Sequence, residues 1–327
     1  MKVLVTGATG FIGGNLARSL TAKGYQVRAL ARPRSSTLTL ENTGVEIVQG
    51  DLENRESLAR ALKGCQAVFH CAALYTFWSR DPKEVYRVNV DGTKTLLQEA
   101  LAAGAEKVVY TSTVSTIGLA KGAEGTEEMQ PAWKDLKGHY KRSKWLGEQE
   151  ALKMNSSGLP VVVVNPTAPV GPWDVKPTPT GGIIRDFLRR RLPAYVNTGM
   201  NLVDVEDVAI GHILAMERGR PGHRYILGHQ NMTLKEMLDL LAKITGLKGP
   251  RFRAPLGPLI GLSRLDYWAE GKLLRRQPIL PLEGLLVAQK PMYVSSGKAV
   301  RELGMPQSPI EGALGKAVRW FKEYGRA

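Results

Sequence analysis

The stretch MKVLVTGATGFIGG, residues 1–14, decides the fold, because an apolar run leads into a glycine-rich turn and then into a helical pattern. Residues 3–5 suit a strand that is buried on both faces. Gly7, Gly10 and Gly13 let the chain turn tightly and bring bare backbone against a pyrophosphate, to which the first amides of the helix would point. The spacing is wider than in the dinucleotide-binding fingerprint G-x-G-x-x-G, so the glycines fit the physical role of that motif but not its exact pattern. A turn without a ligand is the alternative.

The composition is that of a folded protein with a basic balance. The 327 residues are 43% hydrophobic and 23% charged, which fits one large α/β unit or a main domain with a smaller companion. A net charge of +15 predicts anionic partners, whether phosphorylated ligands, an acidic membrane surface or nucleic acid. No zinc-finger spacing or aromatic-interleaved basic run selects nucleic acid, so we expect none. A phosphate-rich cofactor is the favoured explanation, and peripheral membrane contact stays open.

Cysteine and histidine usage excludes several classes. Cys65 and Cys71 are the only cysteines and no secretory segment precedes the first strand, which predicts a reduced, cytoplasmic protein without disulfides. The apolar stretches are interrupted before they reach membrane-spanning length. The five histidines show no metal-ligand spacing, so we expect no metal.

Short apolar runs alternate with amphipathic stretches through the first half of the chain. We expect strands at 26–31, 45–49, 67–71, 107–111 and 159–164. The period of covering helices occupies 11–23, 55–63, 84–103 and 139–154. These repeated strand–helix–strand units predict an α/β fold with a doubly wound parallel sheet.

This regularity breaks after Pro166, where prolines and glycines crowd together. A strand-and-helix pattern returns at 202–216, and amphipathic helices follow at 233–245 and 315–324. We therefore predict a dinucleotide-binding domain from residues 1–166 and 200–218. Residues 167–199 and 219–327 would form a smaller interleaved C-terminal substrate domain over the carboxyl edge of the sheet.

Tyr140 and Lys144 lie four residues apart in a helical pattern, so both occupy one helix face. A tyrosine with a pKa near ~10 is a poor proton carrier at neutral pH, and a nearby ammonium lowers that pKa. Tyr140 could then act as a general acid or base. The same spacing arises by chance on many helices, which is the alternative.

Ser112 and Thr113 follow the expected strand 107–111, at the edge where such a sheet binds ligands. Either hydroxyl could bind a substrate oxygen. A hydroxyl that satisfies local backbone is the alternative. The order of glycine turn, hydroxyl-bearing strand end and tyrosine–lysine pair favours the functional interpretation.

This ordered set resembles the extended short-chain dehydrogenase/reductase superfamily over nearly the whole chain. The motifs are GATGFIG at 7–13, DL at 51–52, HCAA at 70–73, NVDGT at 89–93, YKRSK at 140–144 and NLVDVEDVA at 201–209. The runs GHYKRSK, VNPTAPVGPWDVKPTPTG, PAYVNTGMNLVDVEDVA and RYILG look most similar to the bacterial hopanoid-associated sugar epimerases. Plant dihydroflavonol reductases are more distant relatives. The resemblance implies a Rossmann fold and a nicotinamide cofactor.

The resemblance also implies roles for individual residues. Tyr140 would exchange a proton with the carbonyl or carbinol oxygen, and Lys144 would lower its pKa and hold the nicotinamide ribose. Thr113, where most relatives have serine, would bind the substrate oxygen, with Ser112 in reserve. Asn89 would support the scaffold. The other implied cofactor contacts are Gly7, Thr9, Gly10, Phe11, Ile12, Gly13, Arg32, Asp51 at the adenine, Leu52, Ala72 and Ala73 beneath the dinucleotide, and Pro166.

Arg32 stands at the end of the second expected strand, where an NAD-dependent protein places an acidic residue. With Arg28 and Arg34 nearby, Arg32 favours NADP, and NAD is the alternative cofactor. The alternative without a cofactor role is that Arg32 is simply a solvated surface arginine. Tyr75, Phe77 and Trp78 form either an apolar wall above the nicotinamide or a plain cluster.

We predict hydride transfer at a carbinol or carbonyl carbon of a small-molecule substrate. Reduction of a rotated ketone gives an epimerase, and the family resemblance favours a sugar epimerase of the hopanoid-associated type. Product release gives the alternative, an NADPH-dependent carbonyl reductase similar to dihydroflavonol reductases. A redox-sensing NADP-binding protein and a membrane-surface scaffold are the non-enzyme alternatives. The family resemblance implies a homodimer packed through two long helices.

Overall fold

The computed structural model describes residues 1–76, 78–119, 122–274, 276–279 and 282–324. Its centre is a seven-stranded sheet in the order β10-β6-β5-β4-β1-β2-β3, in which every neighbouring pair is parallel. The strands are β1 (Lys2–Thr6), β2 (Gln26–Ala31), β3 (Glu46–Gln49), β4 (Ala67–His70), β5 (Lys107–Thr111), β6 (Val161–Pro166) and β10 (Arg224–Leu227). The order reverses between β1 and β4, and ligands of open α/β sheets bind at this switch point.

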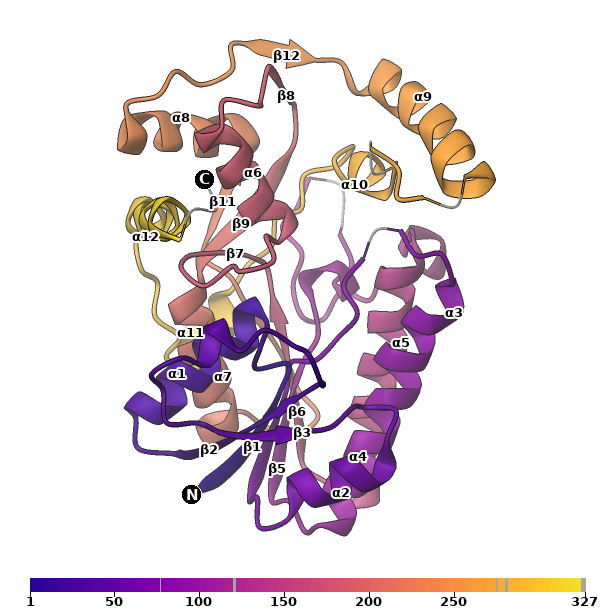
Figure 1. Ribbon diagram of the computed structural model, residues 1–327, viewed down its shortest axis with the longest axis vertical. Helices are drawn as coiled ribbons and strands as arrows, with labels where there is room; N and C mark the ends of the chain where they lie inside the picture. Colours follow the sequence, from indigo (N-terminus) through magenta and orange to yellow (C-terminus); the bar gives the residue numbers. More distant parts are fainter. Residues whose placement is uncertain (77, 120–121, 275, 280–281, 325–327) are drawn as a thin grey trace.

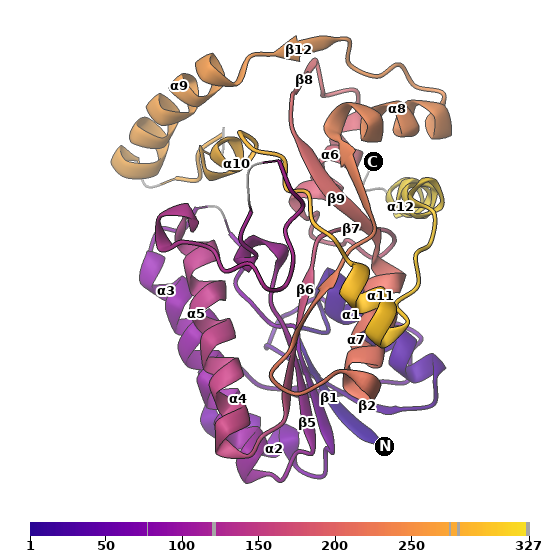
Figure 2. The ribbon, with the colours of Figure 1, turned by 180° about the vertical axis from the view of Figure 1, so that it is seen from behind.

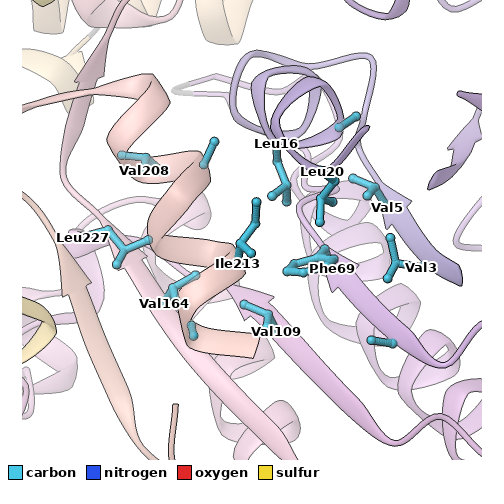
Figure 3. Packing of buried hydrophobic residues seen from close by; sticks show 14 of the residues in the cluster. Val3, Val5, Leu16, Leu20, Phe69, Val109, Val164, Val208, Ile213 and Leu227 are labelled. Carbon is cyan, nitrogen blue, oxygen red and sulfur yellow. The ribbon is translucent and has the colours of Figure 1, made fainter. Parts of the chain in front are cut away.

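Helices cover both faces of this sheet (Figures 1 and 2). One face carries α1 (Phe11–Ala22), α7 (Val205–Arg218) and α11 (Gly297–Leu303), and the other carries α2 (Arg55–Leu62), α4 (Gly92–Ala102) and α5 (His139–Lys153). Alternate residues of β1 serve the two layers: Val3 and Val5 pack with Leu16 and Leu20 (Figure 3), while Leu4 packs on the opposite side. The predicted doubly wound Rossmann fold is confirmed.

The expected helix 84–103 is wrong as a single element. It consists of α3 (Pro82–Tyr86), a π-helical turn η2 (Arg87–Asp91) and α4. Asp81 caps α3 by accepting from the Lys83 amide. Within the turn, the Asn89 side chain is buried. A π-turn inside a helix frequently marks a functional position.

A smaller region lies over the carboxyl edge of the sheet (Figure 1). Its three-stranded sheet, ordered β11-β9-β7, contains β7 (Ala168–Val170), β9 (Gly199–Asp204) and β11 (Gln230–Thr233). Its core includes Phe187, Leu202, Met237 and Phe321. It also contains α6 (Pro179–Leu188), α8 (Leu234–Thr245), α12 (Ile310–Glu323), and the two short paired strands β8 (Ala194–Val196) and β12 (Phe252–Ala254).

The segment after β12 extends to one side as an overhang, comprising α9 (Leu256–Asp266), the π-helix η6 (Tyr267–Leu273) and α10 (Leu282–Val287). Short 3-10 turns occur at η1 (Leu38–Leu40), η3 (Val114–Thr116), η4 (Trp133–Asp135) and η5 (Met154–Ser157). None of the helices in the described ranges combines the length and apolarity required to cross a bilayer.

The predicted domain boundaries need two corrections. Strand β10 falls inside the range 219–327 assigned to the substrate domain, yet it pairs with β6 in the central sheet. Strand β9 lies, except for its first residue, inside the range 200–218 assigned to the dinucleotide-binding domain, yet it pairs with β7 and β11. The second segment of the sheet region therefore contains α7 and β10, whereas β9 belongs to the smaller region.

Candidate active site

The glycine turn after β1 is too crowded for side chains. Gly7 has φ +69°, and an ideal Cβ on it would lie 2.6 Å from the Ala72 nitrogen. A Cβ on Gly13 would lie 2.3 Å from the Gly7 carbonyl oxygen. Gly10 begins α1 without a side-chain cap, and no acidic residue occupies the first turn. The turn therefore offers backbone amides to an anion, and these residues fit the pyrophosphate of a dinucleotide.

A chain of hydrogen bonds connects this turn to η2. The Ala72 amide donates to Thr6 Oγ1 (3.2 Å), which contacts His70 Nδ1 at 2.7 Å. His70 Nε2 contacts Thr93 Oγ1 at 2.9 Å, and that hydroxyl donates to the Asn89 carbonyl at 2.8 Å. Burial lowers the pKa of His70 to about 3, so the ring is neutral, and this bonding pattern assigns its proton to Nε2. The sequence interpretation quoted His70 within HCAA and gave it no role.

Asn89 joins the segment after β4 to α5. Its Oδ1 accepts from the Leu74 amide (2.7 Å), and its Nδ2 donates to the Leu74 carbonyl (3.1 Å) and to Ser143 Oγ (2.9 Å). Gly147 packs against the same turn, since an ideal Cβ on it would lie 2.5 Å from the Asn89 carbonyl oxygen and 2.7 Å from Tyr110 Oη. This placement suits the scaffold role that the resemblance implies for Asn89.

Lys144 is buried, with only 3% of its surface exposed. Its Nζ donates to the Thr111 carbonyl at 2.7 Å and to Tyr110 Oη at 3.1 Å. Burial lowers the pKa of this ammonium to about 8. The lysine is thereby fixed at the carboxyl end of β5.

Tyr140 lies in the first turn of α5, and its ring centroid lies 4.5 Å from that of Tyr75. Burial, and secondarily Tyr75, raises the pKa of the Tyr140 phenol. Our expectation that Lys144 lowers this pKa is wrong for the chain itself, because the ammonium is engaged by Thr111 and Tyr110 and burial dominates. The phenol is held in its protonated, donating form.

The two hydroxyls after β5 have different surroundings. Thr113 is half-buried, and its Oγ1 accepts from the Ser115 amide at 3.2 Å, which caps η3. Ser112 is buried, and its hydroxyl donates to the Glu148 carboxylate in a short hydrogen bond. Thr113 is therefore the more exposed of the two hydroxyl-bearing residues, while Ser112 belongs to a buried network.

That network centres on Glu148, which is completely buried. Its Oε2 accepts from Thr116 Oγ1 (2.7 Å) and Asn165 Nδ2 (3.1 Å), and Asn165 also donates to the Thr113 carbonyl (3.1 Å). Arg224 from β10 pairs with Glu148 and donates to the Thr116 carbonyl at 2.8 Å. Sequence reasoning missed these residues. The available signal was Glu148 itself, a charged residue one helical turn after Lys144 on the same face.

The three arginines near the expected ribose site have different surroundings. Arg32 and Arg34 are exposed directly after β2, and Arg34 has φ +65°. Arg28 faces the other way: its guanidinium donates to the carbonyls of Ala61 (2.8 Å) and Lys63 (2.9 Å) and is paired with Glu46. Its contribution to the NADP argument was therefore wrong.

The remaining predicted cofactor contacts lie along the same edge of the sheet. Asp51 is half-buried after β3, and its Oδ1 accepts from the Glu53 amide at 3.0 Å. Phe11, Leu52 and Pro166 are buried, Thr9, Ile12 and Ala72 are half-buried, and Ala73 is exposed. Phe77, one of the predicted wall residues, lies outside the described residues, whereas Tyr75 is exposed and Trp78 is half-buried.

A carboxylate from the overhang caps the helix that carries Tyr140. Glu283 of α10 accepts from the His139 amide, and a Cβ on Gly138 (φ +89°) would collide with its carboxylate. Burial raises the pKa of Glu283 to about 7. Sequence reasoning missed this residue as well, because no local pattern connects it to α5.

The glycine turn, the hydroxyls after β5 and the tyrosine–lysine pair of α5 thus meet at one edge of a doubly wound sheet. This combination defines an enzyme of the NAD(P)-dependent oxidoreductase and epimerase class. The profile described as the NAD dependent epimerase/dehydratase family matches residues 3–228. The chain belongs to this family of extended short-chain dehydrogenases/reductases.

Individual proteins are similar over nearly their full length. The chain is 48% identical over 98% of its length to a putative dihydroflavonol 4-reductase of Synechocystis sp., of which it covers 94%. It is 35% identical to sterol demethylase protein B of Methylococcus capsulatus, over 99% of both chains. The solved structure of gox2253 matches with a TM-score of 0.88 and 40% identity, over 99% of this chain and 98% of that one.

Proposed function

We propose that this protein is an NADP-dependent carbonyl reductase acting on a largely apolar ketone or the corresponding alcohol. The observation that carries the proposal is the contact of Tyr75 with Tyr140, whose ring centroids lie 4.5 Å apart. The Tyr75 ring would present an aromatic surface beside Tyr140, the proposed proton donor. Burial, with Tyr75 as the smaller cause, raises the pKa of the Tyr140 phenol, which suits a group that donates its proton. The similarity to a putative dihydroflavonol 4-reductase and to sterol demethylase protein B supports the same direction.

Each residue then has a defined task. The bound nicotinamide supplies the hydride for the carbonyl carbon. Tyr140 donates its phenolic proton to the carbonyl oxygen, and Thr113 donates a hydrogen bond that orients that oxygen. Lys144 is held at the carboxyl end of β5 by its hydrogen bond to the Thr111 carbonyl. From there its ammonium would bind the nicotinamide ribose. The turn of Gly7, Gly10 and Gly13 would hold the pyrophosphate.

The preference for NADP rests on Arg32. It is exposed at the end of β2, and a guanidinium at this position suits a 2′-phosphate. Arg34 adds positive charge two residues later. NAD is the alternative cofactor.

A sugar epimerase of the hopanoid-associated type is the second candidate function. The family description names epimerases, and the runs GHYKRSK and PAYVNTGMNLVDVEDVA favour that group. The same proton donor serves both reactions, so the two differ in whether the ketone leaves or is reduced again. A redox sensor is less favoured because Tyr140 and Lys144 are both retained.

The decisive experiment incubates the purified chain with NADPH and a panel of dihydroflavonols, oxosteroids and nucleotide sugars. Nicotinamide absorbance and product stereochemistry are followed together. We expect one NADPH consumed for each ketone reduced, and Tyr140→Phe should lower kcat about 10²- to 10⁴-fold while cofactor binding is retained. Stereochemical inversion of a sugar without net NADPH consumption would establish the epimerase instead, and full turnover by Tyr140→Phe would refute the mechanism.

We further propose a homodimer formed through α4 and α5, the long helices on one face of the sheet. Location in the cytoplasm stays a prediction from the cysteine content.

A further inference from the structure

The overhang exposes apolar side chains that the reaction does not use. On α9 and η6, Leu265 is 67% exposed, Trp268 63% and Leu273 68%. The spacing of Leu262, Leu265 and Trp268 places them on one side of the helix. The exposed apolar residues of this surface, which we call the overhang face, are Leu262, Leu265, Trp268, Leu273, Leu274 and Ile279. So many exposed large apolar side chains within one short segment indicate an interaction site.

The charges around the overhang face have one sign. Among the described residues of 251–279, the exposed charged side chains are all basic: Arg251, Arg253, Arg264, Lys272 and Arg276. The acidic residues of the same stretch, Asp266 and Glu270, are half-buried. The whole chain carries a net charge of +15. The overhang face is therefore complementary to an apolar surface with negative charge at its rim.

We infer that the overhang face docks on an anionic lipid bilayer, with Trp268 and the leucines at the level of the headgroups and Arg264 and Lys272 against lipid phosphates. A helix with a broad apolar side and a basic edge lies in the membrane interface in this way. A second copy of the chain fits less well, because it would bring two basic edges together at a net charge of +15 for each copy.

The overhang contacts the rest of the chain at Trp78 and at the start of α5. Gly271 of η6 packs near Trp78, since an ideal Cβ on Gly271 would lie 3.1 Å from Trp78 Nε1. Glu283 of α10 caps α5 at His139. A bilayer that covers the overhang face thus lies beside the segment that carries Tyr75, which suits delivery of an apolar substrate. Docking itself does not depend on the reaction proposed above.

The test measures co-flotation of the full chain with vesicles of phosphatidylcholine alone or mixed with phosphatidylglycerol, without substrate. We expect binding to the anionic vesicles and little to the neutral ones. Arg264→Glu/Lys272→Glu should weaken binding at least about 20-fold, because each basic residue near the surface contributes roughly a fivefold factor. The matched control Arg60→Glu/Lys63→Glu makes the same charge change at α2, at the opposite end of the molecule (Figure 1), and should bind nearly as the wild type does.

Two further measurements separate lipid contact from bulk charge. Brominated lipids should quench the fluorescence of the wild type more than that of Trp268→Phe, and Leu265→Ser/Leu273→Ser should lose most of its vesicle binding. Equal loss in both charge variants, equal binding to neutral vesicles, or unchanged quenching in Trp268→Phe would overturn the proposal. A dimer that dissociates on Leu265→Ser/Leu273→Ser would assign the face to a second copy and likewise refute lipid docking. Turnover of a soluble ketone is unaffected by these variants, so failure here leaves the proposed reaction standing.

Discussion

Arg224 Nε lies 3.1 Å from Glu148 Oε1, and the two side chains are only 6% and 0% exposed. This buried pair joins β10 to α5, and its hydrogen bonds reach the Thr113–Thr116 turn. The loop that carries Thr113, the hydroxyl proposed to bind the substrate, is therefore held by two buried charges that come from distant parts of the sequence.

Removing one partner of this pair should be costly. Glu148→Ala leaves the Arg224 charge buried and uncompensated, so we expect the free energy of unfolding to fall by about 3–5 kcal/mol in urea titrations. The exposed pair Lys235–Asp239 on α8 is the matched control, and Asp239→Asn should change stability by less than about 1 kcal/mol. Equal effects of the two substitutions would contradict the structural importance of the buried pair.

Substitutions of Thr113 and Ser112, the two hydroxyl-bearing residues after β5, should affect different properties: the first catalysis and the second stability. Thr113→Val removes the hydroxyl proposed to orient the substrate and should lower kcat about 10- to 100-fold, whereas Thr113→Ser should retain most activity. Ser112→Ala removes a partner of buried Glu148 and should lower the free energy of unfolding by about 1–3 kcal/mol with kcat nearly unchanged. The reverse pattern would make Ser112 the catalytic hydroxyl.

Lys144 should give the protein a characteristic pH dependence. Its native pKa of about 8 lies below the unfolded value, so between about pH 8 and pH 10 the unfolded chain binds more protons and stability rises with pH. Over the same range the neutral amine should bind the ribose hydroxyls less strongly, so the KM for NADPH should rise. Urea titrations across this range should show a steeper rise for the wild type than for Lys144→Met. Parallel curves would show that Lys144 is not the group responsible.

Cofactor preference should respond to Arg32. Arg32→Asp removes the cation proposed to bind the 2′-phosphate and should raise the KM for NADPH about 10- to 100-fold while improving use of NADH. Arg60→Asp, an equally exposed arginine on α2, serves as the charge-matched control. If both variants respond equally, the effect is general electrostatic attraction and not recognition at β2.

Alanine substitutions at three glycines should affect cofactor binding to different degrees. A methyl group at Gly13 would lie 2.3 Å from the Gly7 carbonyl oxygen, at Gly10 it would lie 3.2 Å from the same atom, and at Gly312 in α12 it meets nothing within 4 Å. Gly13→Ala should therefore abolish cofactor binding, Gly10→Ala should weaken it, and Gly312→Ala should leave binding intact and stabilise α12 by up to about 1 kcal/mol. Calorimetric titration with NADPH measures all three, and unchanged binding by Gly13→Ala would contradict the assignment of the turn.

Local patterns predicted much of the Rossmann framework. The bounds of β2 and β5 agree with the expected ranges 26–31 and 107–111, because each is a short apolar run between polar turns. The π-turn η2 was missed because it depends on Asn89 bonding to Leu74 and Ser143, which are neighbours only in the folded chain. The overhang was missed because its helices have no buried stripe of their own.

The candidate site was predictable where one motif holds all of its atoms. Tyr140 and Lys144 share a helix face, and the glycine turn is continuous in sequence. The protonation state of Tyr140 was not predictable, because burial and Tyr75 determine it. Arg28 misled the cofactor argument for a similar reason, since its partner Glu46 lies on the neighbouring strand β3.

Gly147 has a consequence for the position of Tyr140, the proposed proton donor. Position 147 lies two helical turns beyond Tyr140, and its bare backbone rests on the Asn89 carbonyl and on Tyr110. Because Gly147 has no side chain, α5 can pack more closely against η2 and β5 than any larger residue at this position would allow. A backbone contact two turns away thus helps to set the position of the Tyr140 phenol, so side chains around the phenol can vary between related proteins without moving α5.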